Sequence, residues 1–543
     1  MKKIMAVIIC CTMLTTMLTG CGGSSSKDKV GATQTQTGEA TATVGASDTS
    51  DISDPAAKAI ADRKAEAEKT GKYKKVVLSF FTWTGAPAGL DRINTLLKTY
   101  TEEKLGLDVE LSIQDVAAYQ QNAKLMLSSG EQMDIFTTCT LSYTNSASTG
   151  YCLDLEQDNL LQDYGQGIIN AIKPEYINAC RIGSKLYGVP GLKDYTISTA
   201  AIIIANEYLD AIGYDYNAAD PDNKGTVKAD WKLIDDLFAQ MHAEFPDKYV
   251  YSTQDNILSQ GSSVDPIGGD FFGSLLDTVN SLKVENTFES SIYYDWCNRM
   301  YQWNQAGYIS PDALTDTTGA SARIKSGACM AMMACSKPGY KTQISGECGR
   351  PVTVFQVGED VLKSSAVSSF PWCINQNTED KVATVQVLNA FYEDPYLSNL
   401  LVWGEEGKDY VETSDGHIDF PEGVDANNAE YYTTMLWLMP NYFISHVWNG
   451  DPLDVYEQTA AFNDNAAKSK ALGFTWDNSD YSSEFTALTN VYDEYAPSLA
   501  YGFVDPKEGI PEFVDQLKSA GLEDYIAAKQ KALDDWAAEN SVK

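Results

Sequence analysis

The chain has 543 residues, which is too long for a single hydrophobic core and favours two or three lobes. Hydrophobic residues make up 44% and charged residues 21%, as in soluble globular proteins and unlike disordered or multi-span ones. The 40 Lys and Arg residues against 75 Asp and Glu give a net charge of −35. A field of this sign repels phosphate backbones and anionic lipid, so it excludes nucleic acid as a partner and charge-driven membrane binding.

The N-terminus has the pattern of an export signal. Two lysines precede a mostly apolar stretch at 4–18, which is shorter than the ~20 residues of a spanning helix. Residues 18–21 (LTGC) resemble a bacterial lipobox, in which the Cys is lipidated and becomes the first mature residue. We therefore expect a signal peptide at 1–20 and lipid (diacylglyceryl, palmitate) on Cys21, which would anchor an extracytoplasmic protein to the outer face of the cell membrane. The alternative is an ordinary secretory signal that happens to contain a Cys.

The next segment is predicted to be a lipid-anchored flexible tether at 21–72. Residues 22–55 are rich in Gly, Ser, Thr, Ala and Gln, and this composition cannot bury enough surface to fold. Residues 55–70 are helix-prone but are expected to be peripheral. The exported chain would have 38 basic and 75 acidic residues, a net charge of −37.

The body opens with alternating strand and helix patterns. The run at 76–82 (VVLSFFT) is continuously apolar, as in a strand buried on both faces. Further strands are predicted at 107–113 and 134–138, and helices at 90–105 and 116–129, each ending at a glycine. This order indicates an α/β lobe with a parallel sheet, in which ligands gather beyond the carboxyl ends of the strands.

A second lobe is expected further along. Strands are predicted at 199–205 (TAAIIIA), 328–334 and 352–357, and helices at 230–243 and 289–306. A long helical region is expected over 379–403 and much of 430–540. Strands that resume after helical segments suggest a chain that crosses between two lobes more than once.

Metal and disulfide frameworks are not expected. Only three histidines occur, and the calcium-like loop at 220–225 has Lys224 at its fifth position and Trp231 at its twelfth, where Glu is required. We therefore predict no metal, no cofactor and an acidic turn there. The eight cysteines beyond Cys21 lack zinc spacing, and buried thiols are favoured over disulfides; they are Cys139, Cys152, Cys180, Cys297, Cys329, Cys335, Cys348 and Cys373.

Several short segments resemble the extracellular solute-binding proteins of bacterial ABC importers (sugar-binding family 1), in the lipoprotein branch with a distinctive C-terminal region. The resemblance covers nearly the whole exported chain. Its segments are 127–136 (LSSGEQMDIF), 185–190 (KLYGVP), 404–410 (GEEGKDY), 462–463 (FN), 469–474 (SKALGF) and 502–506 (GFVDP).

The resemblance implies a two-lobed periplasmic-binding-protein-like fold of type II. Each lobe would be a central sheet flanked by helices, with a helical C-terminal extension. It places lobe 1 at 73–192 and 340–403, and lobe 2 at 193–339 and 404–543. It also implies a monomer without catalysis that holds a small molecule in the cleft between the lobes and delivers it to the permease subunits.

The aromatic content suits a carbohydrate ligand, because Tyr and Trp offer a sugar both an apolar face and a polar tip. The chain has 10 Trp, 31 Tyr and 18 Phe. We expect an oligosaccharide, and a peptide or another small solute is the alternative within the same class. A secreted glycoside hydrolase and a surface lectin are the rivals, but no GxSxG, HExxH or P-loop motif occurs.

Candidate ligand-binding residues follow the predicted strands or the expected crossing between the lobes. For each, packing in a core or at the surface is the alternative. Those after the first and third strands and the crossing at Pro190 are Trp83, Thr84, Tyr143, Thr144, Lys193, Asp194 and Tyr195. Trp372 lies in a strand that the family returns to lobe 1. The lobe 2 candidates follow the 328–334 strand or flank an expected helix break at Pro440; they are Lys337, Tyr340, Asn441, Tyr442 and Trp448.

Overall fold

The computed structural model describes residues 54–83, 85–196, 199–220, 225–253, 258, 263–268, 270–426, 428–433 and 435–542. The expected signal peptide, Cys21, the tether up to residue 53 and Thr84 lie outside the described residues.

The described elements run in chain order through three groups. The first group is α1 (Pro55–Thr70), β1 (Lys74–Thr82), α2 (Leu90–Leu105), β2 (Leu107–Asp115), α3 (Val116–Ser129), β3 (Ile135–Thr137), α4 (Tyr143–Ser148), η2 (Gln157–Asn159), α5 (Leu160–Tyr164), α6 (Gln166–Ala171), α7 (Pro174–Ala179), β4 (Arg181–Ile182), β5 (Lys185–Leu186) and β6 (Gly188–Val189). The second is β7 (Thr199–Ala205), α8 (Asn206–Ala211), α9 (Tyr216–Ala219), β8 (Thr226–Lys228), α10 (Trp231–Glu244), β9 (Tyr249–Ser252), β10 (Ser274–Leu275), β11 (Val284–Glu285), η3 (Thr287–Glu289), α11 (Ser291–Gln305), α12 (Ala320–Ser326), β12 (Cys329–Ser336), α13 (Tyr340–Cys348) and β13 (Val352–Gln356). The third is β14 (Val361–Leu362), β15 (Trp372–Ile374), α14 (Lys381–Glu393), α15 (Pro395–Val402), β16 (Val411–Glu412), β17 (Ile418–Asp419), η4 (Leu436–Leu438), η5 (Tyr442–Ile444), α16 (Val455–Asn465), β18 (Ala467–Lys468), η6 (Ser479–Tyr481), α17 (Ser482–Ala500), α18 (Pro506–Ser519) and α19 (Leu522–Glu539).

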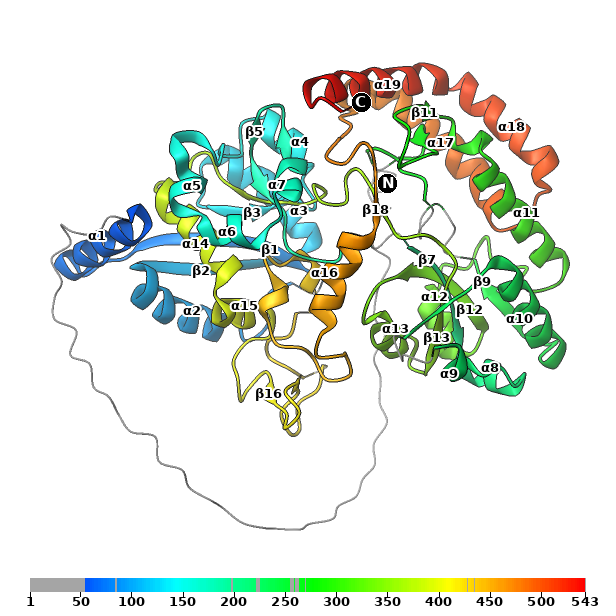
Figure 1. Ribbon diagram of the computed structural model, residues 1–543, viewed down its shortest axis with the longest axis horizontal. Coiled ribbons are helices and arrows are strands. Elements are labelled where there is room, and N and C mark those ends of the chain that lie inside the picture. Colours follow the sequence, from blue (N-terminus) through cyan, green and yellow to red (C-terminus); the bar gives the residue numbers. More distant parts are fainter. Residues whose placement is uncertain are drawn as a thin grey trace, which may run out of the picture.

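The first sheet has the strand order β2-β1-β3-β15-β6 and lies on the left in Figure 1. β1, β2 and β3 are parallel as predicted, whereas β15 runs antiparallel to both β3 and β6. From its third residue on, β1 is buried throughout, which explains its continuous apolar run; β2, at the edge of the sheet, alternates between buried and half-buried residues.

Local signals set the first helices where the sequence predicts them. α2 and α3 end at Gly106 and Gly130, whose φ angles of 67° and 78° lie in the left-handed region that glycine adopts without strain. Asp115 caps α3 by accepting the N–H groups of Ala117 and Ala118. The predicted strand and helix boundaries of this region are therefore confirmed within a few residues.

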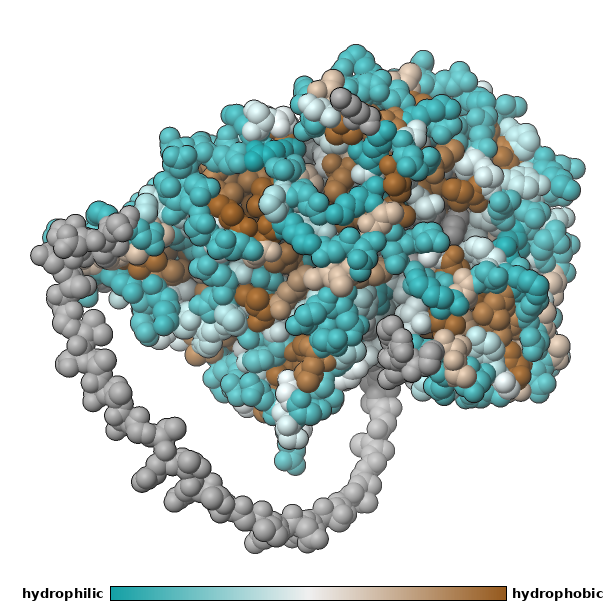
Figure 2. Space-filling model, viewed as in Figure 1, coloured by the Kyte–Doolittle hydropathy of each residue, from teal (hydrophilic) through white to brown (hydrophobic). Residues whose placement is uncertain are grey.

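The second sheet has the order β8-β13-β7-β12-β9 and lies on the right in Figure 1. Its central strand β7 (TAAIIIA) runs antiparallel to β12 and β13. α17, α18 and α19 extend along the top of this lobe, where Leu488, Leu499 and Phe513 belong to its core. Hydrophilic residues cover much of the face in Figure 2, with hydrophobic patches between them.

The expected lobe boundaries need two corrections. Residues 340–357 were expected in lobe 1, but β13 pairs with β7, and Tyr340 and Ile344 of α13 lie in the second core. Residues 404–466 were expected in lobe 2, but Tyr431, Leu438 and Ala466 pack in the first core. In both cases tertiary pairing, which local sequence does not encode, decides to which sheet a segment belongs.

Two local expectations also differ from the structure. α1 was expected to belong to the tether, but Arg63 donates hydrogen bonds to Gln386 and to the Leu105 carbonyl, so this helix docks on lobe 1. The helix break expected at Pro440 is wrong, because only the short turns η4 and η5 flank it. None of the helices that the structure describes is long and apolar enough to span a bilayer.

Candidate ligand-binding site

The topology brings one edge of each sheet to the segments that connect the lobes. β1, β2 and β3 end at the edge of the first sheet where β15 begins and the chain leaves β6 at Pro190. β12, β9 and β13 end at the edge of the second sheet where β7 begins. Residues that follow these strands therefore lie close to the crossings, beyond the carboxyl ends of the parallel strands, where ligands of α/β proteins bind.

Three rings form a group at the edge of the first sheet, which we call the aromatic floor: Trp83, Phe370 and Trp437. The Trp437 ring centroid lies 6.4 Å from that of Trp83 and 5.2 Å from that of Phe370. All three side chains are half-buried. Within the described chain, the indole N–H groups of Trp83 and Trp437 make no hydrogen bond and are not sealed from solvent. The floor thus offers apolar ring faces together with polar tips.

A lysine from the first crossing packs on the floor. Lys193 is only 6% exposed, and its Nζ lies 3.7 Å from the Phe370 ring centroid and 6.0 Å from that of Trp437. This is cation–π geometry, in which the negative ring faces attract the ammonium group. Lys193 therefore holds a positive charge against the aromatic floor.

The neighbouring residue connects the crossing to the second lobe. The Asp194 carboxylate lies 2.6 Å from Lys337 Nζ, and Lys337 directly follows β12. The Asp194 side chain is 4% exposed and that of Lys337 is 26% exposed. An ion pair of this kind fixes the crossing and presents charged hydrogen-bonding groups beside the aromatic floor.

The crossing is held from its other side by α16. Asn463 accepts the N–H groups of Tyr195 and Thr196 at 2.8 and 3.2 Å and donates to the Lys193 carbonyl at 2.7 Å. The Leu192 N–H donates to the Pro440 carbonyl. These bonds set the backbone from which Lys193 and Asp194 project.

The structure brings together four of the predicted site residues: Trp83, Lys193, Asp194 and Lys337. Sequence reasoning missed Phe370, Trp437 and the positioning residue Asn463. Phe370 could have been found, because it lies two residues before the antiparallel strand β15 and so at the carboxyl edge of the parallel strands. Nothing in the local sequence around Trp437 places it beside Trp83.

Six predicted contacts are instead structural residues, because each is buried and its polar group is bonded within the protein or packed in a core. Trp372 is fully buried and donates its indole N–H to the Leu438 carbonyl. The hydroxyls of Tyr143 and Tyr195 donate to the carbonyls of Cys180 and Gly191, and burial raises the pKa of both far above its usual range. The other three are Tyr340 in the second core, Asn441, which donates to the Tyr392 carbonyl, and Tyr442 in the first core.

Two further candidates lie elsewhere. Thr144 is half-buried on α4. Trp448 belongs to a separate aromatic group with Trp403, Phe420 and Tyr432.

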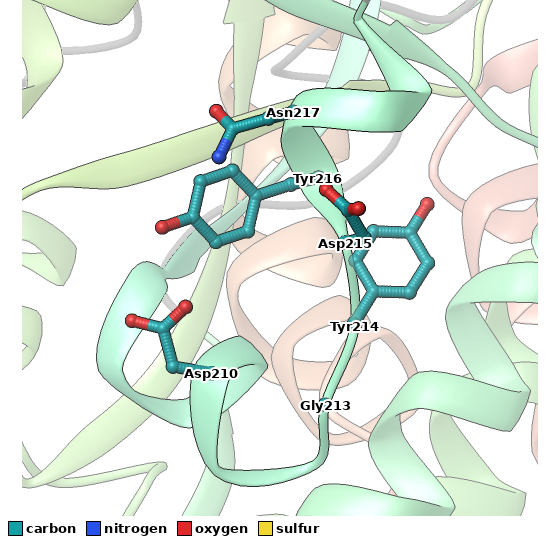
Figure 3. A pocket seen from close by; sticks show the side chains of 6 residues that line it. All are labelled: Asp210, Gly213, Tyr214, Asp215, Tyr216 and Asn217. Atoms are coloured by element: carbon teal, nitrogen blue, oxygen red, sulfur yellow. The ribbon is translucent and has the colours of Figure 1, made fainter.

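The described pockets lie apart from the aromatic floor. One of about 260 Å³ follows α8, where Tyr214, Tyr216 and the carboxylate of Asp210 surround it (Figure 3). Another of about 420 Å³ is lined by Asp277, Asp360 and Asn465, among others. None of the predicted site residues that the structure describes lines either pocket, so neither pocket enters the candidate site.

The eight cysteines and the two ends of the calcium-like loop, Asp220 and Gly225, lie among the described residues. The eight cysteines from 139 to 373 are free thiols, and six of them are buried. Asp220 accepts the N–H of Gly225 at 2.7 Å, and residues 221–224 between them lie outside the described residues. Among the described residues, no group of three or more His, Cys, Asp or Glu side chains could hold a metal ion.

This sequence and fold are similar to those of known proteins. A family model described as a domain of unknown function (DUF3502) matches residues 470–538. A carbohydrate ABC transporter substrate-binding protein of Streptococcus pneumoniae serotype 4 is 22% identical over 467 residues, which covers 85% of this chain and 91% of that protein. The crystal structure of the N-glycan transport solute-binding protein NgtS from Streptococcus pneumoniae is 20% identical, with a TM-score of 0.73 over 85% of this chain and 98% of that one.

The chain has the fold of an extracellular solute-binding protein. The resemblance inferred from the sequence and the two-lobed α/β fold class are thereby confirmed. NgtS in complex with Man1GlcNAc and with Man5GlcNAc gives TM-scores of 0.64 and 0.61. The Streptococcus pneumoniae substrate-binding protein FusA in complex with kestose is 15% identical, with a TM-score of 0.56 over 86% of this chain and 100% of that one. These relatives are binding proteins rather than enzymes.

Proposed function

We propose that this protein is a solute-binding receptor that captures an oligosaccharide between its two lobes and delivers it unaltered to an ABC importer. The solute-binding fold and relatives that bind glycans and kestose support this function. Capture by a two-lobed protein needs ligand contacts from both lobes, because only such contacts favour the closed state.

The observation that carries the proposal is the aromatic floor beside the Asp194–Lys337 ion pair. Half-buried rings with open indole N–H groups match the apolar faces and hydroxyls of a pyranose. The carboxylate and ammonium come from the crossing and from lobe 2, so a sugar on the floor would touch both lobes. We assign Trp83, Phe370 and Trp437 as stacking residues and Lys193, Asp194 and Lys337 as hydroxyl-binding residues.

Movement of the lobes is part of the proposal. NgtS scores 0.73 against this chain in one crystal structure and 0.61 in its complex with Man5GlcNAc. A different arrangement of the lobes in the two crystal structures would produce such a difference. The difference supports a fold that is able to change shape at its crossings.

We propose lobe 1 as residues 73–192 and 358–466, and lobe 2 as residues 193–357 and 467–543. The protein would act outside the cytoplasm as a monomer, tethered through lipidated Cys21, and would present its ligand to the permease subunits. Mass spectrometry of the membrane fraction tests the anchor, because Cys21→Ala should release the protein from that fraction.

A glycan-binding assay tests the function. The purified full-length protein is titrated by calorimetry with Man1GlcNAc, Man5GlcNAc, kestose and a control peptide mixture. Saturable binding of a glycan is expected, and Trp83→Ala should weaken it by about 1–3 kcal/mol if the ring is a stacking platform. Tyr396→Ala is the matched control, because that exposed Tyr lies on α15 and stacks on Tyr100 instead.

Two outcomes would reject the proposal. Binding of peptides but no glycan would favour the alternative receptor for another solute. Recovery of a shortened glycan after incubation, detected by mass spectrometry, would instead indicate a glycoside hydrolase.

A further inference from the structure

A second aromatic group lies on the segment that carries the floor. We call it the distal platform: Phe420, Tyr432 and Trp448. The ring centroid of Trp448 lies 4.7 Å from that of Phe420 and 5.4 Å from that of Tyr432. The rings are supported by Trp403, whose centroid lies 5.1 Å from that of Trp448.

The distal platform combines a fixed base with partly open rings. Trp403 is 4% exposed and donates its indole N–H to the His446 carbonyl at 3.0 Å. The three platform rings are only half-buried. Within the described residues, the indole N–H of Trp448 makes no hydrogen bond and is not sealed from solvent. These are the properties that distinguish the aromatic floor from the buried Trp372.

One chain segment joins the distal platform to the floor. Tyr432 belongs to the platform and Trp437 to the floor, and an extended chain of five residues spans at most about 17 Å. The segment is anchored where Glu430 accepts the N–H of Gly89, in the loop that follows Trp83. The two groups are therefore within reach of one oligosaccharide.

The platform also borders the second lobe. Trp448 begins a turn in which the Asp451 N–H bonds to its carbonyl, and Thr342 of α13 donates to the Gly450 carbonyl at 2.9 Å. An added Cβ at Gly339, next to α13, would meet Asp451 at 3.3 Å. Lys337, which pairs with Asp194, directly precedes this part of lobe 2. The distal platform thus lies along the same junction between the lobes as the ion pair.

We infer that the distal platform is a second sugar-binding subsite, which stacks a ring of the oligosaccharide remote from the one on the aromatic floor. The inference rests on the proposed function and deepens it. It assigns the ligand class as oligosaccharides long enough to reach both aromatic groups. The floor supplies binding to any chain length, and the distal platform adds affinity only for the longer ones.

The test compares chain lengths in wild-type and variant proteins. Full-length protein is titrated with Man1GlcNAc and Man5GlcNAc, and with kestose and fructo-nystose. For whichever of these two glycan pairs the wild-type protein binds, we expect it to bind the longer glycan more tightly than the shorter one. Trp448→Ala should weaken binding of the longer glycan about tenfold and leave binding of the shorter glycan unchanged, whereas Trp83→Ala should weaken binding of both. Tyr396→Ala again serves as the exposed aromatic control.

The failure of this inference is distinguishable from that of the proposed function. Equal effects of Trp448→Ala on both lengths, or none on either, would overturn the second subsite while glycan binding stands. If no glycan binds the wild type, the proposed function fails and this inference falls with it. Should Trp448→Ala not fold, 5-fluorotryptophan labelling gives the answer. The ¹⁹F resonance of Trp448, assigned with Trp448→Phe, must shift with the longer glycan and stay still with the shorter one.

Discussion

Replacing Asn463 should loosen the crossing that carries the site. Its side chain is 2% exposed and makes hydrogen bonds with the backbone of Lys193, Tyr195 and Thr196. A hydrogen bond of this kind contributes about 1 kcal/mol net, and a stranded buried partner costs about 1–3 kcal/mol. Asn463→Ala removes all three bonds, so we expect it to lower the free energy of unfolding by about 3–5 kcal/mol.

Two matched variants separate this effect from general damage to α16. Asn463→Asp keeps the acceptor for both N–H groups but sets a buried carboxylate oxygen against the Lys193 carbonyl. Its loss of stability should therefore shrink at low pH, where the protonated carboxyl donates to that carbonyl, whereas the loss in Asn463→Ala should not. Glu457→Ala changes an exposed residue of the same helix and should have little effect.

Urea unfolding followed by circular dichroism and by tryptophan fluorescence measures these losses, and calorimetry measures glycan affinity. Asn463→Ala should weaken glycan binding as well, because Lys193 and Asp194 project from the loosened backbone. An Asn463→Ala protein as stable as Glu457→Ala would refute the argument that this side chain holds the crossing.

The remaining predictions concern a buried lysine and a half-buried carboxyl. Lys529 is fully buried, with its Nζ 2.9 Å from Asp270 and 3.1 Å from the Gly273 carbonyl, so Lys529→Met should cost about 3–5 kcal/mol in urea unfolding. The double variant with Asp270→Asn should recover part of that loss, and an undiminished loss would contradict the pairing. Burial raises the pKa of Glu347, so this carboxyl keeps its proton to a higher pH in the folded state than in the unfolded chain. The carboxyl therefore contributes less to stability as the pH rises from the ordinary pKa of Glu through the raised pKa. The melting temperature of Glu347→Gln minus that of the wild type should therefore increase as the pH is raised from 4. A difference that stays constant with pH would contradict a raised pKa of Glu347.

Part of the candidate site was predictable from local rules. The position of Trp83 follows from the rule that a residue directly after a buried parallel strand lies at the carboxyl edge of the sheet. The positions of Lys193, Asp194 and Lys337 follow in the same way, from a crossing and from a strand end, and their contact with ligand stays a prediction. The same rules failed for Tyr143 and Trp372, because an aromatic ring near such an edge can point into the core, and backbone position does not fix that direction.

The sequence by itself determined the elements and the class of fold. The apolar run at 76–82, the alternation at 107–113 and the terminating glycines Gly106 and Gly130 each act within a few residues, through burial and backbone conformation. Such signals survive without knowledge of the rest of the chain. The excess of acids and the wealth of aromatic residues likewise limited the partners before any fold was known.

Only the tertiary structure decided which distant segments share a lobe and a site. It places Trp437 against Trp83, Asn463 against the crossing at Tyr195, and β13 beside β7. These contacts join residues that are up to several hundred positions apart, and their partners are selected by the packing of whole sheets. Local patterns carry no record of such partners, because a half-buried ring has the same neighbours in sequence whether it faces a core, solvent or a sugar.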